Sequence, residues 1–210
     1  MHSGLPAPLL DITRVSAGYG SFTVLRDVSI SIRPGTVFGI IGPNGHGKTT
    51  LMNAISGFVR LSKGSIRLGG QRIDGLPPHR IAASGVAHIP QGDLVFPDLS
   101  VFENLSMGAY LERSAARQRE RLDYVYSIFP KLGQRSNQCA SSLSGGERRM
   151  LAIGRGLMGD SRLLLVDEPS LGLAPIIIEQ IYEVLRVLKK KRPDDSGGGG
   201  KSCPPHRPGR

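Results

Sequence analysis

The sequence predicts an α/β fold with a mixed sheet, an antiparallel N-terminal layer and a helical insert. An apolar, β-branched segment at residues 36–41 leads into a glycine-rich loop and then into a helix that begins near residue 50. A second aliphatic segment, residues 163–166, ends in two adjacent carboxylates. Between these two segments, residues 101–128 change to the spacing of amphipathic helices.

Length and composition indicate one soluble globular domain. The chain has 210 residues, of which 39% are hydrophobic and 21% are charged. No apolar run approaches the roughly 18 residues that a membrane-spanning helix needs. Asp11 interrupts the short apolar run at the N-terminus, so we expect no signal peptide. Cys139 and Cys203 lack the spacing of metal ligands and suit a reducing cytosol.

The positive charge is concentrated near the C-terminus. The net charge is +10, and the residues from Lys189 onward contribute half of it, with seven basic and two acidic side chains. This basic tail contains no aromatic residue on which a nucleic-acid base could stack. We therefore expect no nucleic-acid partner.

The first ninety residues are predicted to be rich in strands. Residues 9–16 and 24–32 have the apolar pattern of antiparallel strands, and the loop at residues 18–21 between them carries Tyr19. After a Pro34-Gly35 turn, residues 36–41 are predicted to form a buried strand. The pattern then predicts a strand at 65–68, a Gly69-Gly70 turn, a helix at 77–83, and a strand at 86–89 that ends at Pro90-Gln91-Gly92.

Helices dominate the middle of the chain. Residues 101–111 and 113–128 have helical spacing, and we expect a helical subdomain at about residues 92–158 inside a domain that spans residues 1–191. A helix through Met158 and a strand at 162–166 follow, and Pro175 opens a last helix with an apolar stripe. Residues 192–210 are rich in glycine and proline and lack large apolar side chains, so we expect them to be disordered.

The glycine-rich loop has the pattern G-x-x-x-x-G-K-[ST], which binds nucleotide phosphates. Its glycines let consecutive backbone N–H groups point at an anion, and the helix N-terminus adds partial positive charge. Lys48 is expected to reach the β- and γ-phosphates, and the Thr49 hydroxyl is expected to hold Mg²⁺. The candidate nucleotide-binding residues here are Gly42, Pro43, Asn44, Gly45, His46, Gly47, Lys48, Thr49 and Thr50.

The aliphatic strand at 163–166 is followed by Asp167 and Glu168. A strand that is buried on both faces can present carboxylates only at its end. We expect Asp167 to join the Mg²⁺ shell and Glu168 to orient or deprotonate the attacking water.

Residues 144–147 have two compatible interpretations. Ser144 and Glu147 have the spacing of a capping box, in which serine and glutamate satisfy each other's backbone N–H groups at a helix start. Ser144, Gly145 and Gly146 also form a candidate second anion nest. Both interpretations hold together, because the cap would position the nest.

The order of these motifs resembles that of ATP-binding cassette (ABC) ATPases, which have a P-loop NTPase core. The resemblance covers about residues 9–191, and LSGGE at residues 143–147, the signature segment, separates this family from other P-loop ATPases. It implies that Tyr19 stacks on adenine and that Gln91 senses Mg²⁺, takes part in catalysis and signals to a membrane partner. It also implies that the signature segment, including Glu147, closes over the nucleotide of a second ATP-binding subunit in a head-to-tail dimer.

A finer resemblance links the chain to the ATP-binding subunits of branched-chain amino-acid importers. Residues 76–82, 96–101 and 169–175 carry it, and the subunits of urea importers are similar. It implies transport-coupled ATP hydrolysis at the inner face of the cell membrane, with transmembrane permease subunits as partners. A periplasmic or extracellular solute-binding protein would take part indirectly.

The C-terminal part departs from this family's pattern. Members continue with a further strand that ends in a switch histidine, whereas here a proline- and glycine-rich stretch follows residue 191. His206 follows Pro204-Pro205, which no central strand tolerates, so it is not assigned that role. We expect a truncated or frameshifted C-terminus. Two alternatives stay open, a nucleotide-binding module with little or no turnover and a urea or amide importer ATPase. Repair and translation ATPases need coiled coils or tandem cassettes, for which 210 residues leave no room.

Overall fold

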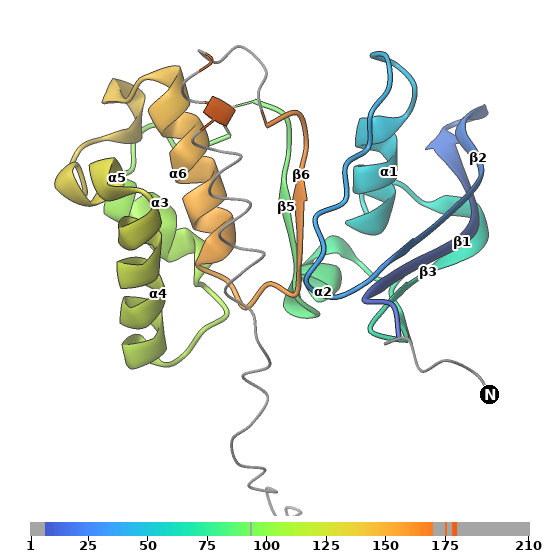
Figure 1. Cartoon of the computed structure of the whole chain (residues 1–210), viewed down its shortest axis with the longest axis horizontal. Coiled ribbons are helices and arrows are strands. Elements are labelled where there is room, and N and C mark those ends of the chain that lie inside the picture. Colours follow the sequence, from blue (N-terminus) through green and yellow to red (C-terminus); the bar gives the residue numbers. More distant parts are fainter. Residues whose placement is uncertain (1–6, 93, 170–174, 176–177, 180–210) are drawn as a thin grey trace, which may run out of the picture.

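Alternating apolar residues near the N-terminus produce a four-stranded antiparallel sheet in the computed structural model. The structure describes residues 7–92, 94–169, 175, 178 and 179. The strand order is β2-β1-β3-β4, and one face of the sheet packs on α1 and contributes the first hydrophobic core (Figure 1). The bounds are β1 Leu10–Tyr19, β2 Phe22–Ile32, β3 Leu61–Leu68, β4 Gln71–Arg72 and α1 Lys48–Ile55.

The first hairpin is tighter than the sequence predicts. Strand β1 continues to Tyr19, which pairs with Phe22, so that only two residues form the turn. Gly18 makes this close pairing feasible, because a Cβ at that position would lie 1.9 Å from the Phe22 carbonyl oxygen. The predicted loop at 18–21 is therefore wrong in extent, and Tyr19 stands at a strand end with 53% of its surface exposed.

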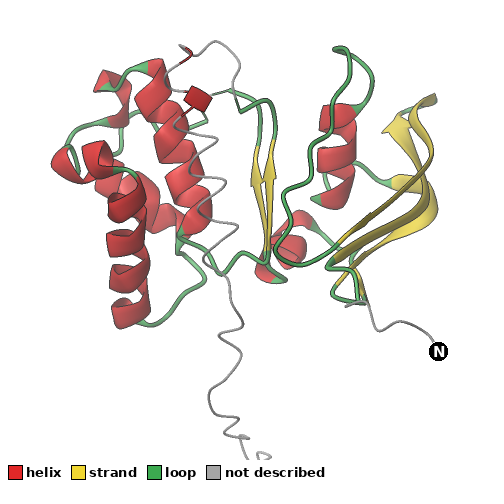
Figure 2. Cartoon of the chain, viewed as in Figure 1, coloured by secondary structure: helices red, strands yellow, loops and turns green. Residues whose placement is uncertain are grey.

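Strands β5 (Val86–Ile89) and β6 (Leu163–Val166) form a separate parallel pair, as their aliphatic sequences predict. Alternate side chains of the pair enter two different cores. Leu163 and Leu165 belong to the first core, whereas Leu164 and Val166 pack against a second core. The pair thus divides the molecule into two apolar regions, and both strands end at the same edge (Figure 2).

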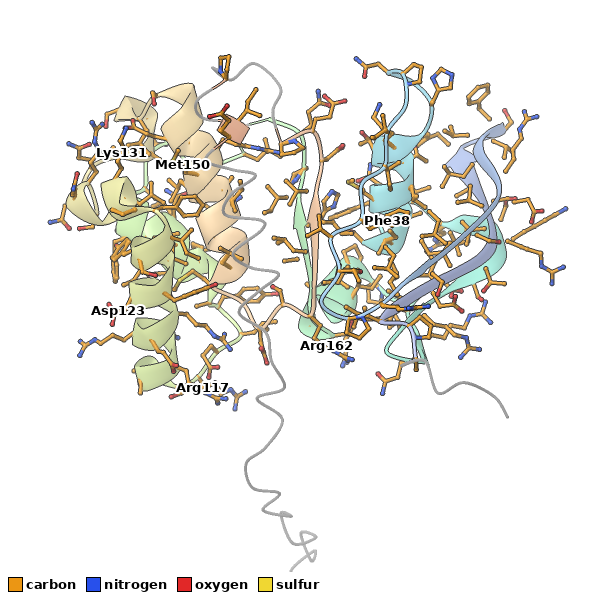
Figure 3. All side chains as sticks on the ribbon, in the orientation of Figure 1. Phe38, Arg117, Asp123, Lys131, Met150 and Arg162 are labelled. Atoms are coloured by element: carbon orange, nitrogen blue, oxygen red, sulfur yellow. The ribbon has the colours of Figure 1, made fainter. Side chains whose placement is uncertain are left out.

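The prediction of a buried strand at residues 36–41 is wrong. These residues run between α1 and the β5–β6 pair, but within the described part of the chain no strand pairs with them. Val37 and Phe38 are 60% and 51% exposed, and Ile41 is 98% exposed. Figure 3 shows Phe38 beside α1. The apolar pattern indicates a strand, but a strand also needs a neighbour that satisfies its backbone groups.

The helical part of the chain has its own core. Helix α6 packs on α3, α4 and α5, and the second core fills the space between them. Both α3 and α6 begin with complete capping boxes, on Ser100 and Ser144. The bounds are α2 Pro78–Ala83, α3 Val101–Gly108, α4 Ala115–Ile128, α5 Pro130–Gln134, a 3₁₀ turn Ala140–Ser142 and α6 Gly145–Leu157.

Fully buried Asn104 fixes the loop that enters this part. Its side-chain oxygen accepts the Phe96 N–H at 2.8 Å, and its amide donates to the carbonyls of Phe96, Leu99 and Ser100. All four contacts hold the loop on α3. No helix among the described residues is long and apolar enough to cross a membrane. Of the predicted last helix only residues 175, 178 and 179 are described, and the predicted disordered tail lies outside the described residues.

Substitutions should destabilise the protein at a buried apolar residue and have little effect at an exposed one in the 36–41 segment. Leu151→Ala should lower the free energy of unfolding by about 2–5 kcal/mol, because it opens a cavity in the second core. Ile41→Thr should change it by no more than about 0.5 kcal/mol, because its side chain is almost fully exposed. Guanidinium unfolding followed by circular dichroism measures both. Equal losses would mean that residues 36–41 are buried in solution.

Candidate active site

The phosphate loop, residues 42–49, joins the 36–41 segment to α1 as predicted. Gly45 and Gly47 have φ angles of 82° and 87°, in the left-handed region where other residues are strained. Gly47 is also close-packed, because a Cβ there would lie 3.0 Å from Leu25 Cδ2. It caps α1 without a side-chain hydrogen bond, so its own side chain does not compete with a ligand for the first N–H groups of the helix.

The Lys48 ammonium lies within this loop. It donates to the carbonyl oxygens of Gly42 at 2.9 Å and Pro43 at 3.0 Å, with Asn44 Oδ1 at 3.5 Å. Thr49 is exposed, whereas Thr50 is buried and leaves its backbone rather than its side chain for a ligand. His46 is exposed and its ring nitrogen lies 3.3 Å from the Asn44 carbonyl oxygen. The Lys48 ammonium is thus held against the carbonyl oxygens of the phosphate loop.

Asp167 extends strand β6 on the face that turns towards the first core. Its backbone N–H donates to the Ile89 carbonyl at 2.9 Å, which continues the β5–β6 ladder by one step. Only 1% of its surface is exposed, and Oδ2 is buried without a hydrogen-bond partner among the described residues. A buried carboxylate oxygen without a donor is costly unless a ligand satisfies it.

Glu168 and Gln91 come together from the ends of the two parallel strands. Gln91 Nε2 donates to Glu168 Oε2 at 3.1 Å, although 77 positions separate them in the sequence. Glu168 has a φ of 44°, in the left-handed region that costs energy for a residue with a side chain. The chain bends at Asp167 and Glu168, directly after the last residue of β6.

His88 lies on the same face of β5 as Asp167 does on β6, and the sequence did not single it out. Its Nδ1 lies 3.1 Å from the Ser56 hydroxyl, at the end of α1. Burial lowers the pKa of His88, while the nearby Asp167 carboxylate opposes that shift. The contact therefore links the helix that begins at the phosphate loop to the strand that ends at Gln91.

Arg149 is the residue that sequence reasoning missed. It lies on α6 with 3% of its surface exposed, and its guanidinium donates to the carbonyls of Pro90, Gly92 and Asp167. The available signal was a charged residue within the apolar stripe of α6, beside Ala152 and Ile153. Long-range contacts of this kind cannot be read from spacing alone.

The signature segment begins α6, as the capping interpretation predicts. Ser144 Oγ accepts the Glu147 N–H, and the Glu147 carboxylate accepts the Ser144 N–H at 3.0 Å. That backbone hydrogen bond lowers the pKa of Glu147 against the opposing effect of burial. Arg135 pairs with Glu147 at 3.3 Å. Gly145 and Gly146 stay partly exposed, so the helix start is open to an anion.

These residues form two groups at one end of the molecule. The ends of β5 and β6 and the starts of α1 and α6 all lie at the same end, with α1 and α6 on opposite sides of the strand pair (Figure 1). Gln91, Asp167 and Glu168 form one group, and the phosphate loop forms the other. Among the described residues, no hydrogen bond or ion pair joins them to the phosphate loop. Figure 3 shows Arg162 at the other end of the strand pair.

The donor set fits Mg²⁺ held jointly with a nucleotide. No cluster of three or more His, Cys, Asp or Glu side chains that could hold a metal ion occurs in the part of the chain that the structure describes. Mg²⁺ commonly takes one or two carboxylates, several waters and the substrate phosphates rather than a full protein cage. The unpartnered oxygen of Asp167 matches that requirement.

Comparisons with known proteins show the family of the chain. The family model described as ABC transporter matches residues 25–171. The high-affinity branched-chain amino acid transport ATP-binding protein BraG of Pseudomonas aeruginosa is 44% identical over 183 residues, or 87% of this chain and 78% of BraG. The probable branched-chain amino acid transport ATP-binding protein LivF of Archaeoglobus fulgidus is 37% identical, over 86% of this chain and 75% of LivF.

More distant proteins share the fold and the family. The lipopolysaccharide export system ATP-binding protein LptB of Haemophilus influenzae is 34% identical, over 87% of this chain and 76% of its own. A nucleotide-free ATP-binding cassette from an ABC transporter superposes with a TM-score of 0.77 and 28% identity, over 88% of this chain and 78% of that one. The predicted fold class is thereby confirmed, and the chain belongs to the ABC transporter family as an ATP-binding, ATP-hydrolysing subunit.

Proposed function

We propose that this chain hydrolyses ATP to drive a branched-chain amino-acid importer. The observation that carries the hydrolytic role is the Gln91–Glu168 hydrogen bond beside buried Asp167, at the same end of the molecule as the phosphate loop. The solute class rests on the higher identity with BraG than with the export protein LptB. The reaction is ATP plus water to ADP plus phosphate.

ATP would bind through the phosphate loop. Backbone N–H groups of residues 42–50, except Pro43, which has none, would contact the phosphates, and Lys48 would exchange its carbonyl partners for phosphate oxygens. Tyr19, at the exposed end of the first hairpin, would stack on adenine. Residues 1–191 would form one nucleotide-binding domain around this site.

Thr49, Gln91 and Asp167 would hold Mg²⁺. When bound, the ion neutralises charge on the phosphates. The Asp167 carboxylate is prepared for that contact, because its buried Oδ2 has no donor among the described residues. Gln91 would contribute its side-chain oxygen, since its Nε2 already donates to Glu168.

Glu168 would accept a proton from the attacking water. The Gln91 amide holds one of its oxygens at 3.1 Å, which leaves the other oxygen for the water. Gln91 therefore positions the base as well as facing the metal. In this arrangement both residues depend on the β5 and β6 ends remaining in register.

The signature segment would act on a second copy of the site. Within one chain it lies on the opposite side of the β5–β6 pair from the phosphate loop (Figure 1). Ser144, Gly145 and Gly146, held by the Glu147 cap, would therefore close over the nucleotide of a partner subunit in a head-to-tail dimer.

An exposed apolar patch would receive the transmembrane permease. Five apolar side chains of the proposed helical subdomain, residues 92–158, are 44–64% exposed and line one cavity of about 810 Å³: Leu94, Phe96, Met107, Tyr110 and Leu111. The cavity also includes Pro90 and Gly92, on either side of Gln91. A cytoplasmic segment of the permease seated there would hold the chain at the inner membrane face. A solute-binding protein would act only through that permease.

Two alternatives share the same nucleotide site. A urea or amide importer would differ in its other subunits, which select the solute. A module that binds ATP with little turnover is favoured by the unpaired segment at residues 36–41, since it leaves the phosphate loop without a strand neighbour on that side among the described residues. The turnover number of the purified chain separates that module from an active ATPase.

ATP binding should depend on Lys48. At a ligand concentration a hundredfold above Kd, binding adds about 2.7 kcal/mol to the stability of the native state. Mg-ATP should therefore raise the melting temperature of the wild type, and Lys48→Ala should lose most of that rise. Differential scanning fluorimetry measures it, and an equal rise in both proteins would contradict the assignment.

Substitutions of the two carboxylates should affect ATP hydrolysis in different ways. Glu168→Gln should retain ATP affinity and lower kcat by at least about 100-fold, because the base is lost while the shape is kept. Asp167→Asn should instead raise the Mg²⁺ concentration needed for half-maximal hydrolysis. Phosphate release across a Mg²⁺ titration measures both effects, and wild-type hydrolysis by Glu168→Gln would remove Glu168 as the base.

Membrane attachment should need the permease and the apolar patch. Co-expressed with branched-chain amino-acid permease subunits, the chain should stay in the membrane fraction after a wash with about 0.5 M salt, which screens adhesion by the basic tail. Leu111→Glu should release it, whereas Leu76→Glu, at an exposed leucine outside the patch, should not. Salt-resistant attachment to vesicles without a permease would instead indicate direct lipid binding.

A further inference from the structure

One buried arginine touches both strand ends of the proposed hydrolytic site. Arg149 donates from one guanidinium nitrogen to the carbonyls of Pro90 at 2.9 Å and Gly92 at 3.0 Å. A second nitrogen donates to the Asp167 carbonyl. The first two carbonyls lie on either side of Gln91, and the third belongs to the peptide that leads into Glu168.

These contacts fix the backbone from which Gln91 and Glu168 project. A carbonyl that is held by a donor fixes the orientation of its whole peptide plane, because the peptide bond is planar. The guanidinium is itself planar, with its donors in a rigid fork, so it also sets the separation of the carbonyls that it joins. Among the described residues, the last hydrogen bond of the β5–β6 ladder joins the Asp167 N–H to the Ile89 carbonyl. Beyond that point the hydrogen bonds of Arg149 join the two strand ends.

We propose that Arg149 is a positioning residue for ATP hydrolysis, one that holds Gln91 and Glu168 at hydrogen-bond distance. The inference rests on the proposed function of Glu168 as the base. Arg149 would also link the hydrolytic pair to the signature segment, because it lies two residues after Glu147 on α6, the helix that the signature segment begins. A shift of that helix moves the guanidinium, and with it the peptides on both sides of the hydrolytic pair.

Substitution of Arg149 should lower kcat and leave nucleotide binding unchanged. Misplacement of a reacting group by about 1 Å can cost about 100-fold in rate, and Arg149→Gln should lower kcat by about 10- to 100-fold. The Kd for ATP should stay within about twofold, because the carbonyls of Pro90, Gly92 and Asp167 that Arg149 contacts belong to the β5 and β6 ends. Arg149→Lys, which keeps the charge without the planar fork, should show an intermediate loss.

A matched variant separates positioning from general packing. Arg121 also ties α6 to a neighbour, since it donates to the Met158 carbonyl at 3.1 Å just beyond the far end of that helix. Arg121→Gln should lower the melting temperature and leave kcat within about twofold. If Arg149→Gln fails to fold by circular dichroism, the Lys variant carries the comparison.

A double-mutant cycle with Gln91→Ala is the decisive measurement. If Arg149 acts through the Gln91–Glu168 contact, its substitution should cost far less in the Gln91→Ala background than in the wild type. Fully additive losses, or a kcat for Arg149→Gln equal to that of Arg121→Gln, would overturn the inference alone. Glu168→Gln is measured in parallel. Wild-type hydrolysis by that variant would overturn the proposed role of Glu168 and the inference with it.

Discussion

The parallel ladder between β5 and β6 is the constraint on which the rest of the structure depends. Because parallel strands run in one direction, Gln91 after β5 and Asp167 after β6 emerge at the same edge. The same ladder forms the wall between the two cores, so α1 and α6 are held on opposite sides of that edge. A change in its register would move the carboxylates and both helix starts together.

The site concentrates unfavourable local features that the surrounding packing holds in place. Among the described residues, Asp167 has a buried oxygen without a donor and His88 has a buried ring nitrogen without a partner, and Glu168 has a left-handed φ. Each costs stability, and such costs persist where surrounding structure over-determines the conformation. Here the two flanking cores and the Arg149 contacts supply that constraint.

Local sequence predicted the parts of the site that local interactions build. The phosphate loop needs left-handed glycines before a helix, and the cap at Ser144 needs only a partner three residues later, so both were recognisable. The strand expected at residues 36–41 failed because strand formation depends on a neighbour elsewhere in the chain. The contacts of Arg149 and the Gln91–Glu168 pairing depend on the fold, and no spacing rule predicts them.

The Lys48 ammonium is hydrogen-bonded to carbonyl oxygens of its own phosphate loop. Because the ammonium already donates to the Gly42 and Pro43 carbonyls, a phosphate bound as proposed would compete with these protein groups for that cation. The net gain per contact is then a small difference between two charge-assisted hydrogen bonds. In the proposed site, release of the product would return Lys48 to the carbonyl oxygens that it contacts here.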